Sequence, residues 1–159
     1  MTGRSFSRAS GLAGACAALA LAAAGCGGSS EQKSTSAAAD VTAQVEQVCR
    51  QATGEFDKLP EPTDTRKAVE AQLRSAQIFS TMVGRLNELE TNVGLPVSYK
   101  GWLDQLDQLP ALNQKAADAF SRDGVTSDQA VSAGEAWQSK ADQANDLARQ
   151  AGLSGCVFG

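Results

Sequence analysis

The sequence predicts an all-α domain, an antiparallel up-down-up-down four-helix bundle, and three observations carry this prediction. Apolar residues recur at spacings of three and four along four stretches between 40 and 151, which is the period of one helix face. No stretch alternates with period two for long, and no Asn-Gly hairpin signal appears, so strands are not expected. Short connections separate the four stretches, and short connections favour antiparallel neighbours.

The first helix is predicted to begin at Asp40, because its carboxylate can accept hydrogen bonds from the free N–H groups of a first turn. It is predicted to end near Leu59, because the residue before a proline is pushed out of the helical region. The apolar face of this helix consists of Val41, Val45, Val48, Ala52, Phe56 and Leu59.

The second helix is predicted to begin at Thr63 or Asp64 and to stop before Gly94 and Pro96, which are typical residues past a helix end. Its length would be about 40 Å, at 1.5 Å per residue. The apolar face consists of Val69, Leu73, Ala76, Ile78 or Phe79, Val83, Leu86 and Leu89.

The third segment, from 97 to 122, is predicted to be one helix with a kink at Pro110. Proline removes a backbone hydrogen bond and clashes with the carbonyl of Leu106, yet the apolar phase is nearly the same on both sides of it. The apolar face consists of Tyr99, Leu103, Leu106, Leu109, Leu112, Ala116 and Phe120.

The fourth helix is predicted to begin at a capping box, with Thr126 as N-cap and Gln129 reaching back to it. It is predicted to end at Ala151, with Gly152 as the left-handed terminator and Leu153 as the hydrophobic contact that follows. Its face is mostly small, with one large residue: Ala130, Ala133, Trp137, Ala141, Ala144 and Ala148.

Composition excludes several classes of function. The chain has no histidine, which rules out Ser-His-Asp and Cys-His catalysis and histidine-ligated metals. The net charge is −4, and the cations are scattered rather than clustered, so no nucleic-acid partner is expected. Acidic pairs such as Asp142 and Asp146 are interpreted as a solvated face, with a weak carboxylate-only calcium site as the alternative. No catalytic residue, metal ligand or cofactor is predicted.

Residues 1–25 have the pattern of an export signal. Arg4 and Arg8 precede an uncharged segment rich in alanine and leucine. This segment is too short to span a membrane, because a spanning helix needs about 20 apolar residues. The segment ends in Leu21-Ala22-Ala23-Ala24-Gly25-Cys26, which resembles a bacterial lipobox, with Ala23 where that pattern prefers leucine. We therefore expect Cys26 to be lipidated; the alternative is an ordinary secretory peptide cleaved nearby.

The segment after Cys26 is rich in Gly, Ser, Thr, Gln and Ala and has no apolar period, so 26–39 is predicted to be a lipidated cysteine followed by a disordered linker. The helical domain is predicted to span 40–159. Together these features place the protein on the outer face of the cytoplasmic membrane, held there by its lipid anchor.

Cys49 and Cys156 are predicted to form a disulfide bond. Both lie in the exported domain, and oxidising compartments allow such bonds to persist. In an up-down-up-down bundle the first and last helices have their outer ends together, which brings these two cysteines close. The enclosed loop exceeds 100 residues, for which the chain-entropy estimate of the stabilisation is about 4–5 kcal/mol.

These features occur together in a known group. The lipobox at Cys26, the early Cys49, the turn Leu59-Pro60-Glu61-Pro62 and the ending Ala151-Gly152-Leu153-Ser154-Gly155-Cys156 resemble those of small uncharacterised actinobacterial lipoproteins. The resemblance covers the whole chain. It implies an envelope location and a helical domain, and it supplies no catalytic residues.

The leading hypothesis is a non-enzymatic, membrane-tethered binding or interaction module of the cell envelope. The alternative is a carrier of a small apolar ligand, with a pocket between helices near Trp102 and Trp137. A third class, an enzyme with an unrecognised carboxylate site, would require convergent buried carboxylates.

Overall fold

The computed structural model describes residues 31–158, and the regular structure in this range is entirely helical. The signal segment and Cys26 lie outside the described residues. The helices are α1 (Glu31–Phe56), α2 (Thr65–Val93), α3 (Lys100–Leu106), α4 (Leu109–Asp123) and α5 (Asp128–Gln150), with the short 3-10 helices η1 (Val97–Tyr99) and η2 (Ser154–Cys156).

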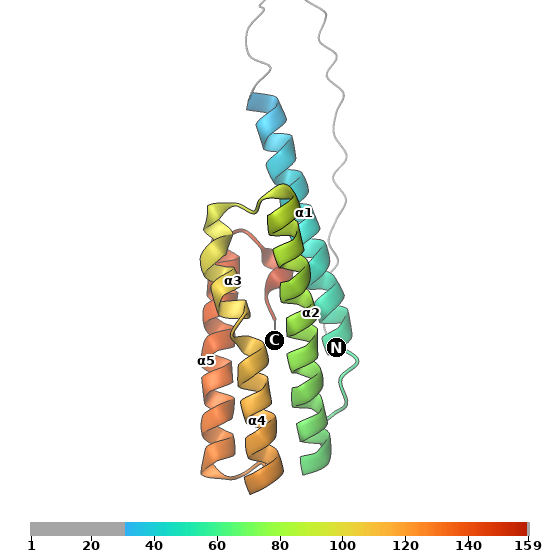
Figure 1. Ribbon diagram of the computed structural model, residues 1–159, viewed down its shortest axis with the longest axis vertical. Coiled ribbons are helices and arrows are strands. Elements are labelled where there is room, and N and C mark those ends of the chain that lie inside the picture. Colours follow the sequence, from blue (N-terminus) through green and yellow to red (C-terminus); the bar gives the residue numbers. More distant parts are fainter. Residues whose placement is uncertain (1–30, 159) are drawn as a thin grey trace, which may run out of the picture.

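The prediction of a helical bundle is confirmed. In Figure 1, α1 and α2 run in opposite directions, α3 and α4 follow one another along the third leg, and α5 returns beside α4. The segment after α5 does not continue along the bundle. It turns back so that η2 packs against both α1 and α5.

The predicted start of the first helix at Asp40 is wrong. The helix begins at Glu31, so the expected disordered linker over 26–39 is helical from Glu31 onward. Three consecutive alanines, 37–39, precede Asp40, and alanine has the highest intrinsic helix propensity. The residues that favour a helix therefore begin before the first apolar residue of the stripe, Val41.

The prediction of one kinked third helix is also wrong. The segment is divided into α3 and α4 at Asp107 and Gln108, where the Gln108 N–H bonds to the Gln105 carbonyl at 3.2 Å in a tighter turn. Pro110 lies in the first turn of α4, where its missing N–H needs no helical partner. The division lets α3 pack on α5, while α4 packs on both α2 and α5.

Two of the predicted helix ends hold as expected. The Asp64 carboxylate accepts a hydrogen bond from the Lys67 N–H at 2.8 Å, which caps α2. At the end of α5, Gly152 has a positive φ of 75°, and the Leu153 N–H bonds to the Ala148 carbonyl at 2.9 Å. These are the features of a Schellman motif, and Leu153 is fully buried as its hydrophobic contact.

The predicted N-cap of the fourth helix is wrong by one residue. Ser127, not Thr126, caps α5, and its hydroxyl accepts from the Ala130 N–H at 3.2 Å. The Ser127 hydroxyl also donates to the Gly124 carbonyl at 2.9 Å. Ser127 can therefore satisfy a group on each side of the turn, which explains its preference over Thr126.

The buried residues divide the bundle into two halves. The disulfide half consists of α1, α3, η2 and the later parts of α2 and α5, and its core contains Trp102, Tyr99, Phe79, Met82, Leu86, Leu106 and Leu153. The alanine half consists of the first part of α2, most of α4 and the first part of α5, and its buried residues are Ala68, Ala76, Asn113, Ala116, Ala117, Ala119 and Ala130. In Figure 1, α2, α4 and α5 extend past the end of α1 into the alanine half.

Candidate binding groove and the pinned tail

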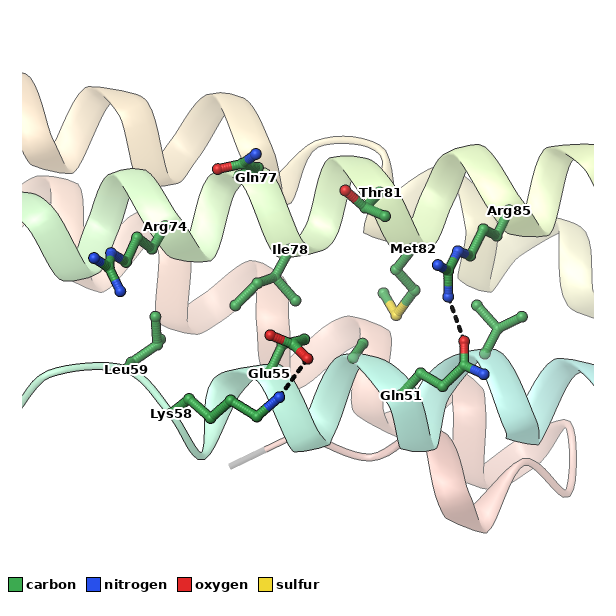
Figure 2. A pocket seen from close by; sticks show the side chains of 12 residues that line it. Gln51, Glu55, Lys58, Leu59, Arg74, Gln77, Ile78, Thr81, Met82 and Arg85 are labelled. Carbon is green, nitrogen blue, oxygen red and sulfur yellow. Dashed lines mark hydrogen bonds and ion pairs between the residues drawn. The ribbon is translucent and has the colours of Figure 1, made fainter.

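A groove of about 710 Å³ lies along the seam between α1 and α2 in the disulfide half. Its floor is apolar. Ala52 and Met82 are buried, and the half-buried Val48, Leu59 and Ile78 complete it. Figure 2 shows Ile78 and Met82 pointing from α2 toward α1.

The spacing of the residues explains why a groove forms here. The residues of α2 that line it recur every three or four positions from 74 to 85, so they occupy one helix face. On α1 the central residue of the facing stripe is Ala52, whose side chain is a single methyl group. A small residue opposite Ile78 and Met82 leaves the seam hollow. Phe56, the larger residue one turn later, packs instead on Phe79 with the ring centroids 4.8 Å apart.

The rim of the groove carries three cations and one carboxylate: Lys58, Arg74, Arg85 and Glu55. Lys58 pairs with Glu55 at 2.6 Å, and Arg74 pairs with Glu70, just outside the lining, at 2.7 Å. Arg85 instead donates to the side-chain oxygen of Gln51 across the seam (Figure 2). Exposed ion pairs of this kind contribute about 0–1 kcal/mol, so these cations can change partners at little cost.

The predicted disulfide between Cys49 and Cys156 is present, with the two Cα atoms 5.0 Å apart. Both cysteines are fully buried. The bond joins Cys49, about two turns before the end of α1, to η2, so it fastens the tail segment, residues 152–158, along the later part of the first helix.

Asn145 holds the end of the tail segment through two hydrogen bonds to the backbone of one residue. Its amide nitrogen donates to the Phe158 carbonyl at 2.8 Å, and its oxygen accepts from the Phe158 N–H at 2.9 Å. The Phe158 ring then lies 5.9 Å from Phe56 and 5.6 Å from Phe79 between centroids. The three rings therefore contact one another, which packs the end of the tail segment against α1 and α2.

Glu46 makes a third attachment to the tail segment. One of its carboxylate oxygens accepts from the Gly155 N–H at 3.3 Å and from the Ser154 hydroxyl at 3.4 Å. Arg50 lies 3.6 Å from the other oxygen. An ideal Cβ on Gly155 would lie 3.5 Å from the Glu46 side chain, which is an ordinary van der Waals distance, so the tail segment lies close to α1 without requiring glycine at this position.

The two tryptophans line neither this groove nor a second, shallow groove of about 470 Å³ between α4 and α5. Trp102 is 0% exposed and packs edge-on against Tyr99, with ring centroids 6.4 Å apart. Trp137 is half-buried against the same core. The indole N–H groups of both tryptophans are buried without a hydrogen-bond partner. The ligand pocket near Trp102 and Trp137 stays a prediction.

The acidic pair singled out in the sequence lies exposed on α5. Asp142 accepts from Gln138 at 3.0 Å, and Asp146 accepts from Arg149 at 2.7 Å. Within residues 31–158, no three or more His, Cys, Asp or Glu side chains are grouped so that they could hold a metal ion. No helix in the same range is long and apolar enough to cross a membrane.

Comparison with known proteins adds no relative: no protein-family model, no curated protein and no solved structure matches this chain.

The α1–α2 groove and the role of Asn145 were not predicted. The groove depends on how two helices face each other, and a single helical stripe does not report that. Asn145 left a weaker signal, because it lies between Ala144 and Ala148 at the apolar face of α5. A polar residue buried in such a face needs a hydrogen-bond partner, and here the tail segment supplies it.

Proposed function

We propose that this protein is a non-enzymatic binding module of the cell envelope, anchored through a lipidated Cys26 to the outer face of the cytoplasmic membrane. In this proposal residues 1–25 are the lipoprotein signal, and the bundle is presented outside the membrane. The membership of the actinobacterial lipoprotein group belongs to the same proposal.

The observation that carries the proposal is the buried disulfide between Cys49 and Cys156. Structural disulfides of this kind persist in oxidising compartments and are rare in the reducing cytosol. Cys26 follows an export-type segment and sits ahead of this disulfide-bonded domain. A lipidated first cysteine and a disulfide-bonded bundle are both consistent with a location outside the cytoplasm.

The binding part of the proposal is supported by the groove. A hollow of about 710 Å³ is within the range of about 300–1,000 Å³ that ligand sites occupy. Its lining combines an apolar floor with hydrogen-bonding and charged groups at the rim, which suits recognition.

The anchor is tested by fractionating cells that express the full chain or its Cys26→Ser variant. We expect the native chain in the membrane fraction and the variant either released or left as unprocessed precursor. Mass measurement of the N-terminal peptide should show lipid on Cys26. The matched control is Cys49→Ser with Cys156→Ser, which removes two other cysteines and should leave the chain in the membrane fraction. The anchor would be overturned if the Cys26→Ser variant were processed like the native chain and were found in the membrane fraction.

A further inference from the structure

We propose that the α1–α2 groove is a docking site for an acidic amphipathic helix of a partner protein. This deepens the proposed binding function by naming the class of ligand. The juxtaposition that supports it is a strip of apolar residues flanked by cations, on a protein that is otherwise acidic.

The charge of the groove is opposite to that of the chain. Its lining holds three of the 14 Lys and Arg residues but only one of the 18 Asp and Glu residues, and with Glu70, which pairs with Arg74 just outside it, the site keeps a net positive charge although that of the chain is −4. A positive site in a negative protein attracts an acidic partner to that site and repels it elsewhere, which gives both orientation and specificity.

The positions of the cations favour a long ligand over one with a single charged head. Arg74 and Arg85 start about 16 Å apart along α2, at 1.5 Å per residue. In Figure 2, Arg74 lies beside Leu59 at one end of the groove, and Arg85 lies beside Gln51 at the other. An anionic lipid would concentrate its charge at one end. A helix of about 11 residues covers the distance and can offer a carboxylate to each arginine.

The shape of the groove points the same way. It runs along the seam between two antiparallel helices, with Val48, Ala52 and Met82 in the floor and Gln51, Gln77 and Thr81 at the edges. A helix laid in such a groove contacts it with residues at spacings of three and four. Its apolar face meets the floor, and its flanks meet the rim. A small acyl chain laid in this open groove would keep one side in water, whereas small-ligand sites bury most of the surface of their ligand.

The test uses the full-length protein in phosphatidylcholine nanodiscs and a displayed library of 18-residue peptides. Each peptide has leucine at helical spacing and random residues elsewhere. We expect the enriched peptides to carry a net negative charge beside the leucine stripe. Binding of a synthetic copy to the double variant Arg74→Glu/Arg85→Glu should be at least about tenfold weaker.

The matched control is Arg66→Glu/Arg122→Glu, which changes the net charge equally at two exposed arginines outside the groove. Its affinity should stay within about twofold of native, which separates a local effect from long-range repulsion. Circular dichroism should show the same helicity for all three proteins.

Three outcomes would overturn the inference: no enriched peptides, enriched peptides without acidic residues, or equal binding to the Arg74→Glu/Arg85→Glu variant. A fourth is binding to phosphatidylglycerol vesicles that this variant abolishes while no peptide binds, because the site would then recognise lipid. If the anchor at Cys26 fails its own test, the selection is done in buffer, so the two proposals fail separately.

Discussion

The disulfide half and the alanine half of the bundle are stabilised by different means. In the disulfide half, large buried side chains, among them Trp102, Phe79, Met82 and Leu106, share one core with the disulfide. In the alanine half, the buried residues are six alanines and Asn113, on three helices. Small residues let helix axes approach closely, so that half gains its contacts from backbone proximity rather than from large side chains.

The difference explains why α1 depends on the tail segment. Within the described residues, α1 packs mainly against α2 and η2, whereas α4 packs directly on both α2 and α5. The first helix is therefore held by one neighbouring helix, the disulfide and the tail. The half with the larger side chains therefore also contains the helix that depends on the tail segment for support.

The largest effect should follow from removing the disulfide by Cys49→Ala with Cys156→Ala. At a separation of 107 residues the chain-entropy estimate is a loss of about 4–5 kcal/mol in the free energy of unfolding. Most of the far-ultraviolet circular dichroism should remain, because α4 still packs on both α2 and α5. Thermal melting with and without reductant measures the loss. An unchanged melting temperature would contradict the idea that the tail supports α1.

An intermediate effect is expected from overpacking the alanine half. Ala116 is 1% exposed on α4, and Ala116→Leu should cost about 1–3 kcal/mol, because the neighbouring helices must separate. Ala111→Leu is the matched control, since Ala111 lies exposed on the same helix and should change stability by less than about 0.5 kcal/mol. Urea unfolding compares the two. A tolerated Ala116→Leu would mean that the alanine half is not closely packed.

The smallest of the three effects is expected from Asn145→Ala, which leaves the Phe158 N–H and carbonyl without their partner. The expected cost is about 1–2 kcal/mol, in the range for removing one partner of a part-buried hydrogen bond. Hydrogen exchange at Phe158 should become faster, while the disulfide keeps Cys156 in place. The control is Asn87→Ala on the exposed face of α2. Unchanged exchange would show that the aromatic contacts alone hold the tail.

The helical class, several helix ends and the disulfide pair could be predicted from local patterns in the amino-acid sequence. Helix periodicity is a local property, and Asp64 and Gly152 act through backbone groups within a few residues of themselves. The pairing of Cys49 with Cys156 could be predicted because these two cysteines lie near the two ends of the predicted helical domain. These inferences did not require knowing which helix faces which.

The division of the segment 97–122 into α3 and α4, the course of the tail segment and the groove could not be predicted, because they depend on how the helices pack. The break at Asp107 and Gln108 lets α3 and α4 face different neighbours, although their apolar stripes are almost in phase. The groove arises because Ala52 faces larger residues across a seam between two helices. Such features depend on contacts between residues far apart in the chain, and no local pattern contains that information.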